Sequence, residues 1–190
     1  MKIKLLWISI FSLFTLTGFA QTYYYTQFQV GGQFGLRNPG YDGVFNGYAA
    51  HFIFGLNFND RAYVGLGAGN ETFRGSYVST DASDRNAIRR QYDTYLMPLF
   101  IDARAPLYYL NDYSWIGILG NTGYAPRIGP VYDRGFLFRG GLLYVYETMR
   151  RNNYTVSVSY GYQELNRNAH DFGRRFQHQH LSLSLGLMLK

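Results

Sequence analysis

Apolar and polar residues alternate along most of this chain with a period of two. In Tyr24–Leu36 the even positions are mostly apolar, and Gln and Gly dominate the odd ones. The pattern is clearest near the C-terminus, where five leucines from Leu181 to Leu189 alternate with small or polar residues. Successive side chains of a β-strand point to opposite faces, so this alternation predicts strands with one apolar and one polar face.

Eight alternating segments follow one another along the chain. They span Tyr24–Leu36, Tyr48–Phe58, Val64–Glu71, Tyr95–Leu107, Trp115–Tyr124, Phe136–Glu147, Tyr154–Gln163 and His180–Leu189. Short links (59–61, 108–113 and 150–152) alternate with longer polar stretches, the longest at about 75–93. Short turns at one end, long loops at the other and an even strand number are typical of an outer-membrane barrel with periplasmic termini.

The residue types on the two faces indicate which face points outward. After position 20 the chain has one Lys, at position 190, and three Glu, whereas a solvated outer face is normally rich in both. The apolar face carries Leu, Val, Phe and Tyr, as a lipid-facing band with aromatic girdles does. We therefore predict an all-β fold, an eight-stranded antiparallel up-and-down transmembrane β-barrel. The alternative is a soluble lipocalin-like barrel with its apolar face inside.

The first twenty residues have the features of a secretory signal. Lys2 and Lys4 precede the apolar run Leu5–Leu16, and Gly18 and Ala20 are small residues at the −3 and −1 positions. The run is short for a membrane-spanning helix, which needs about 20 residues, so cleavage before Gln21 is favoured over an uncleaved anchor. We expect residues 1–20 to be a signal peptide and residues 21–190 to form one barrel domain.

Composition excludes several classes of protein. The 190 residues contain no Cys, which removes disulfide scaffolds, thiolate metal sites, cysteine nucleophiles and the acylated cysteine of a lipoprotein. The net charge of +6 falls to +4 without Lys2 and Lys4, which is weak support for nucleic-acid binding in so aromatic a chain. We expect no nucleic-acid partner and no cofactor.

With these features the chain resembles the small eight-stranded OmpA/OmpX-type outer-membrane barrel family of Gram-negative bacteria, often described as porin-like. The segment Tyr95–Arg104 and the final leucine strand carry the resemblance. It implies residence in the outer membrane, contact with its lipid and lipopolysaccharide, and insertion by the barrel insertion machinery. Family members usually end in an aromatic residue, whereas this chain ends Leu187-Met-Leu-Lys190.

The polar face of an eight-stranded barrel fills the interior, because eight strands enclose just enough room for side chains. Its charged members are Glu71, Asp102, Arg104, Arg139 and Glu147. We predict an upper Glu71–Arg139 pair and a lower Arg104–Glu147 pair, with Asp102 competing for Arg104. Buried charges need partners in any barrel, so a structural network is favoured over a proton or ion gate.

The glycines of the third segment also enter this prediction. Gly65, Gly67 and Gly69 lie on the polar face and lack side chains. We expect them to leave space inside the barrel for Arg104.

Two other kinds of site are less well supported. His180-Leu-Ser182 matches the His-x-Ser spacing of the lipid A deacylase family, but no acid follows Ser182 and both residues fall on the inward face. His170, His178 and His180 have Asp171 as the nearby carboxylate, too few ligands for a defined metal site. We expect neither a catalytic nor a metal site.

Arginines gather in or beside the long connections. Because the guanidinium fork suits phosphate, these residues are candidates for lipopolysaccharide contacts, and ordinary solvated loop charge is the alternative. The candidates are Arg89, Arg90, Arg127, Arg134, Arg174 and Arg175. We expect a non-enzymatic protein that acts through its extracellular loops or in envelope integrity. The alternatives are a subunit that docks onto a larger envelope assembly, and a lipid A-modifying enzyme.

Overall fold

The computed structural model describes residues 22–80, 89–129, 131–149, 152–166 and 175–190, and the expected signal peptide lies outside them. The described residues form strands and no helix. The strands are β1 (Thr22–Arg37), β2 (Tyr41–Asp42), β3 (Phe45–Phe58), β4 (Ala62–Ser79), β5 (Arg90–Leu96), β6 (Leu99–Asn111), β7 (Ser114–Ala125), β8 (Gly135–Glu147), β9 (Asn152–Asn166) and β10 (Arg175–Leu189). None of the described segments is a helix able to cross a membrane.

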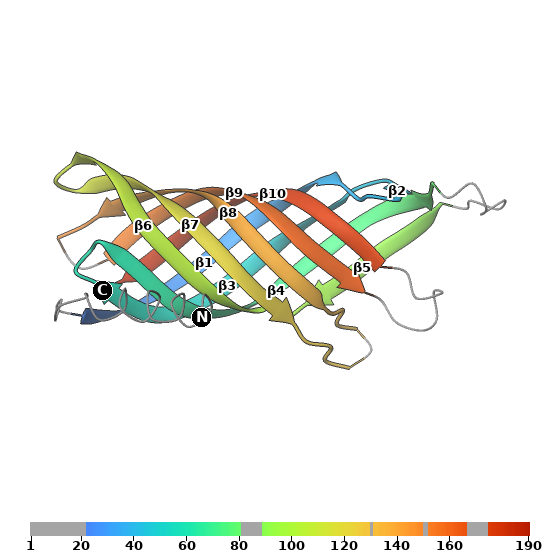
Figure 1. The fold of residues 1–190 in the computed structure, drawn as a ribbon, viewed down its shortest axis with the longest axis horizontal. Helices are drawn as coiled ribbons and strands as arrows, with labels where there is room; N and C mark the ends of the chain where they lie inside the picture. The colour runs from blue at the N-terminus through green and yellow to red at the C-terminus, as the bar shows by residue number, and fades with distance from the viewer. Residues whose placement is uncertain (1–21, 81–88, 130, 150–151, 167–174) are drawn as a thin grey trace, which may run out of the picture.

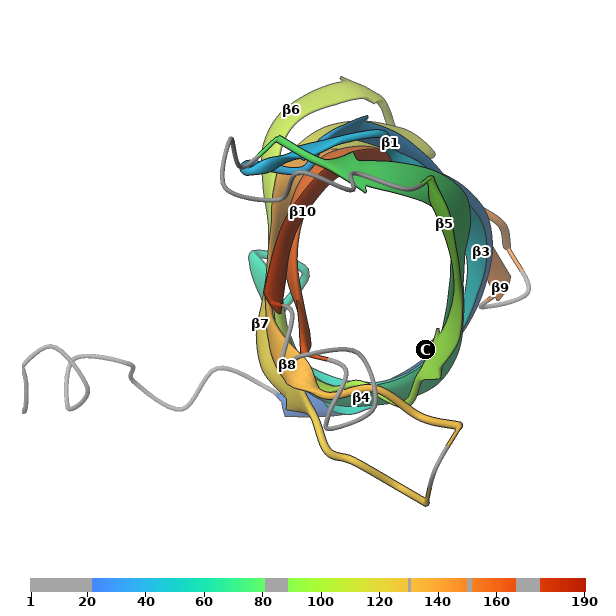
Figure 2. The same ribbon diagram turned by 90° about the vertical axis from the view of Figure 1, so that its right-hand side faces the viewer.

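The strands close into a barrel by antiparallel pairing (Figure 2). The ring runs β1-β3-β4-β6-β7-β8-β9-β10 and returns to β1. β5 and β6 form one barrel strand, since the pairs Glu71–Leu96 and Ala68–Leu99 keep the same register on β4. Pro98 interrupts that strand because proline has no backbone N–H for the ladder. The predicted eight-stranded antiparallel barrel is confirmed, with β2 as a two-residue addition beside β4.

The barrel has two different ends (Figure 1). The start of β1, the end of β10 and the turn after β3 share one end, which we call the terminal end. The other, the loop end, carries the longer connections. The predicted 75–93 loop is wrong in its bounds: β4 continues to Ser79 and β5 starts at Arg90. The extension is stable as a hairpin because Tyr77 and Tyr92 point inward and pack among aromatic rings.

The two faces of each strand differ as predicted. On β10, Leu185 is 59% exposed on the outside while its neighbour Ser184 is 7% exposed. The same contrast between apolar residues outside and polar residues inside holds around the ring. Leu66 on β4 and Phe136 on β8 are exposed, whereas Glu71 and Asp102 are completely buried. The barrel therefore has an apolar outside and charged groups inside.

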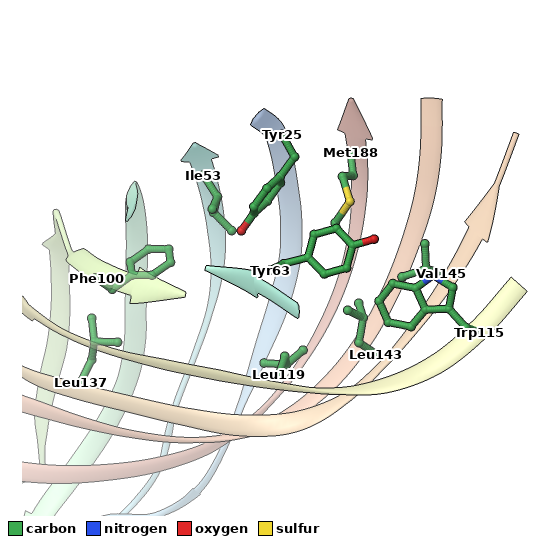
Figure 3. Packing of buried hydrophobic residues seen from close by; sticks show 10 residues of the cluster. All are labelled: Tyr25, Ile53, Tyr63, Phe100, Trp115, Leu119, Leu137, Leu143, Val145 and Met188. Atoms are coloured by element: carbon green, nitrogen blue, oxygen red, sulfur yellow. The ribbon is translucent and has the colours of Figure 1, made fainter. Parts of the chain in front are cut away.

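The interior also contains two apolar clusters, so the expectation that the inward residues form a polar core is wrong for these two regions. One begins at the terminal end and is shown in Figure 3: Tyr25, Ile53, Tyr63, Phe100, Trp115, Leu119, Leu137, Leu143, Val145 and Met188. The other fills the loop end: Phe45, Phe73, Tyr77, Tyr92, Leu96, Ala125, Leu165 and Phe176. Their rings pack edge-to-face or stacked, as aromatic pairs prefer.

Candidate functional site

The first charge cluster in the lumen is centred on Glu71 of β4. Its Oε1 lies 2.8 Å from His51 Nε2 on β3 and also accepts a hydrogen bond from Arg139 Nη2 on β8. Its Oε2 accepts a hydrogen bond from Gln33 Nε2 on β1 at 3.1 Å. The carboxylate is thus bonded to side chains from three other strands, which links opposite walls of the barrel.

The second charge cluster is centred on Asp102 of β6. Arg104 binds its carboxylate with two bonds, Nε to Oδ2 at 2.8 Å and Nη2 to Oδ1 at 3.1 Å. Tyr25 Oη donates to Oδ2 at 3.2 Å, and Asn121 Nδ2 donates to Oδ1 at 2.6 Å. Arg104 Nη1 also donates to Gln27 on β1. Four donors reach the two carboxylate oxygens, which matches their acceptor capacity.

The structure corrects the predicted pairing of Arg104. Arg104 pairs with Asp102 rather than with Glu147, because both residues point inward from β6 two positions apart. The predicted glycine space is also taken by other side chains. A Cβ at Gly65, Gly67 or Gly69 would meet Tyr25, Phe100 or His51 respectively, and Arg104 is not among the three nearest contacts of any of them.

Glu147 belongs instead to a cluster at the terminal end. Lys190 Nζ lies 2.7 Å from both Glu147 Oε1 and Asp60 Oδ1, and Trp115 Nε1 donates to the same Glu147 oxygen at 3.1 Å. Lys190 therefore bridges the turn after β3 and the end of β8. Sequence reasoning missed this contact, although a solitary lysine in so lysine-poor a segment is a signal that could have suggested it.

The turn that holds Asp60 has an unusual backbone. Asn59 and Asp60 have φ values of 53° and 58°, as the two central residues of a type I′ turn require, and the Arg61 N–H closes this turn by donating to the Phe58 carbonyl at 3.1 Å. Burial tends to raise the pKa of Asp60, but hydrogen bonds from Lys190, Tyr63 and Asn57 outweigh it and hold the pKa below its ordinary value. The side chain thus ties the turn to the rim of the barrel.

The polar lumen has little free space. Among the described residues, a cavity of about 10 Å³ is lined by Gln33, Arg139, Ser182 and their neighbours. That volume is about what a single water molecule needs. Between two apolar clusters and two hydrogen-bonded carboxylates, this part of the lumen can hold water but no ligand-sized molecule.

Of the candidate histidines and serine, His178, His180 and Ser182 lie inside the barrel. His178 and His180 have stacked rings 5.3 Å apart, and His178 Nδ1 lies 2.8 Å from Asn38 Oδ1. His180 and Ser182 are buried in the lumen, away from the apolar outer surface. No group of three metal-ligating side chains occurs in the described part of the chain, and His170 and Asp171 lie outside it.

The candidate arginines occupy different environments at the loop end. Arg175 forms an exposed ion pair with Glu164, while Arg89 and Arg127 are exposed. Arg90 and Arg134 have interactions within the protein. Arg174 lies outside the described residues.

These features define a class of protein: a small antiparallel β-barrel with an apolar outer face and a filled, ion-paired lumen. No family model and no curated protein sequence matches the chain. Among solved structures, the fold is similar to that of Neisserial surface protein A, with a TM-score of 0.54 and 13% identical residues. The similarity covers 89% of this chain and 98% of that one. At this identity the comparison supports the shared fold.

Proposed function

We propose that the protein is a non-enzymatic outer-membrane barrel whose loop end faces outward, whose termini face the periplasm, and which acts through its outer surface or in envelope integrity. The observation that carries this proposal is the inverted distribution of polarity. Large apolar side chains are exposed around the outside, while Glu71, Asp102 and Gln163 are fully buried. Such an arrangement is favourable in lipid and unfavourable in water.

The filled lumen supports an outward-acting role over transport. Aromatic clusters close the interior toward both ends, and the charged groups between them are held in hydrogen bonds. The comparison is consistent with this outward-acting role, because the similar fold belongs to a protein named as a surface protein. We further propose that the barrel insertion machinery assembles it, as the family resemblance implies.

Substitution on β10 tests the membrane placement. Leu185→Arg puts a charge on the outer face and should destabilise the barrel by about 2–4 kcal/mol if the site lies near the bilayer midplane. Gln177→Arg is the matched control, because Gln177 is exposed on the same strand beyond the run of leucines. The measurement is heat-modifiable gel mobility, with urea titration, after folding into lipid bilayers.

The expected outcome is a lower folded fraction for Leu185→Arg and a wild-type fraction for Gln177→Arg. Equal folding of Leu185→Arg and wild type would show that the leucine face is not in lipid. A soluble barrel would then be the better interpretation.

The lipid partner we propose is lipopolysaccharide. Arg127 and Arg89 are exposed at the loop end, and Arg fits phosphate bidentately. Arg175 is not part of this proposed contact, because Glu164 already engages it.

One observation favours the alternative of a subunit in a larger assembly. Ala103, Ala105 and Gly120 make a stretch of small side chains on the outer surface of β6 and β7, beside Val64 and Ile118. Small residues allow close approach of another protein within a membrane. Ala103→Phe should then remove a co-purifying partner after mild detergent extraction. A partner-free wild-type preparation would exclude this role.

A further inference from the structure

The apolar outer surface is hollowed by a groove that crosses β4, β6, β7 and β8. Leu66, Ile101, Tyr124 and Phe136 contribute to its walls, and its volume is about 570 Å³. This is within the range of about 300–1,000 Å³ found for small-molecule pockets. Its lining is almost entirely carbon, so it suits a hydrocarbon chain.

The groove is shaped by one short side chain. Thr122 of β7 points outward between larger neighbours, since its register partners are Ile101 on β6 and Phe138 on β8. Gly67 and Gly123 also border the groove and add no side chain to it. A larger residue at position 122 would therefore fill the groove without entering the lumen.

One exposed arginine follows in sequence the end of the groove that points to the loop end. Tyr124 and Phe136 are register partners with ring centroids 5.0 Å apart, and they are the last groove residues before the loop of residues 126–134. Arg127 lies three positions after Tyr124, whereas Arg134, two positions before Phe136, has interactions within the protein. Arg127 is exposed.

The carboxylate of this loop is buried and bonded within the protein, and its Oδ1 accepts a hydrogen bond from the Arg134 backbone N–H at 2.7 Å. Asp133 is 4% exposed, and its Oδ2 accepts a hydrogen bond from Tyr92 at 2.7 Å. Its backbone N–H donates to the Tyr95 carbonyl at 2.9 Å, which fixes the loop to β5. The loop beside the groove is therefore anchored to β5, and Arg127 is exposed on it.

We propose that this groove binds lipid A, with one acyl chain in the groove and a phosphate at Arg127. The proposal rests on the proposed membrane placement, in which the loop end lies in the outer leaflet where lipid A is the phosphorylated lipid. The apolar lining provides a surface for the chain, and a guanidinium fork matches a phosphate group. Neither feature alone selects this lipid; their adjacency does.

Native mass spectrometry of the folded full-length protein in detergent, titrated with hexa-acylated bisphosphorylated lipid A, tests the proposal. Thr122→Phe and Arg127→Gln should each weaken binding of a single lipid by about tenfold. Val30→Phe is the matched control for Thr122→Phe, because Val30 faces outward on β1 across the ring. Arg175→Gln is the control for Arg127→Gln, and both controls should bind as wild type does.

Two further ligands separate the sources of affinity. Dephosphorylated lipid A should bind wild type more weakly than lipid A does. The two lipids should bind Arg127→Gln with equal affinity. Phosphatidylglycerol should bind more weakly than lipid A to all variants. Wild-type binding by Thr122→Phe and Arg127→Gln, or equal loss in the two controls, would overturn the groove site. Equal affinity for phosphatidylglycerol would overturn lipid A as the ligand.

Failure of this inference is distinguishable from failure of the proposed function. Each variant is first scored for heat-modifiable folding in bilayers. A wild-type chain that folds there but binds no lipid A overturns the groove site alone, and one that does not fold there overturns the membrane placement.

Discussion

Asp102 illustrates how a buried charge is accommodated inside this barrel. Arg104 provides the opposite charge, and Tyr25 and Asn121 satisfy the remaining acceptor capacity of the carboxylate. The exposed pair of Arg74 and Asp93 forms a similar contact at 3.0 Å, yet water screens it. The same chemistry therefore contributes very differently to stability inside the lumen and on the rim.

Removing the charge of Asp102 should be strongly destabilising. Asp102→Asn leaves the Arg104 guanidinium buried without an anion, and we expect a loss of about 3–5 kcal/mol in the free energy of unfolding. The double variant Asp102→Asn/Arg104→Gln should recover part of it. Urea unfolding in lipid vesicles measures both, and additive losses would show that the two residues are not coupled.

Acid should weaken the contact of Asp60 with Lys190. The folded-state pKa of Asp60 lies below its ordinary value of about 3.9, so its contribution to stability is present above that value and is lost as pH falls through the folded pKa. Wild type should be more stable than Asp60→Asn at pH 7, and the difference should shrink below about pH 4. Urea midpoints of the two proteins across this range provide the measurement, and a constant difference would contradict the expectation.

At the scale of the element, glycines in β4 allow rings from other strands to reach the barrel wall. A Cβ on Gly67 would lie 2.3 Å from the Phe100 ring, and one on Gly65 would lie 2.8 Å from the Tyr25 hydroxyl oxygen. The glycines of the third segment therefore serve aromatic packing. β4 can remain a strand at these positions because its ladder partners on β3 and β6 hold the backbone.

Gly67→Ala should destabilise the barrel by about 1–3 kcal/mol, because the ring it meets is packed and cannot move freely. The double variant Gly67→Ala/Phe100→Leu should lose less stability than Gly67→Ala, because a Leu side chain occupies less space beside position 67 than the Phe100 ring. Gly32→Ala is the matched control, since its nearest contact would be 3.4 Å from a Phe34 ring on the outer face. Thermal unfolding in detergent distinguishes them; equal effects of the two alanine substitutions would argue against the packing explanation.

At the scale of the whole molecule, side chains of two chemical kinds, apolar and charged, fill the lumen. Apolar clusters occupy regions toward both ends, and hydrogen-bonded charges link the walls between them. The barrel is therefore a filled cylinder, and its surfaces are the parts available for interaction.

The protein should conduct ions poorly for this reason. Purified monomer in planar bilayers should show no stable conductance above background, and Asp102→Asn should not open a steady pore because the apolar clusters remain. Uniform large channels from wild-type monomer would show that the lumen opens in the membrane.

Much of the architecture could be predicted from alternation alone. Neighbouring residues of a strand point to opposite sides, so the sequence of Leu181–Leu189 already implied one apolar face, and eight such segments implied an even-numbered barrel. The same local rule placed Glu71, Asp102, Arg104 and Arg139 on the inward face, where the structure has them.

The tertiary structure decided which inward groups meet. Arg104 binds Asp102, and Lys190 reaches Asp60 across 130 positions of sequence, because contact depends on strand register and on the rim geometry of the closed ring. Rings from β1, β3 and β6 likewise fill the spaces beside the β4 glycines. Alternation sets the side to which a residue points, which is a local property of the backbone; its partner depends on long-range closure of the barrel, which no local pattern encodes.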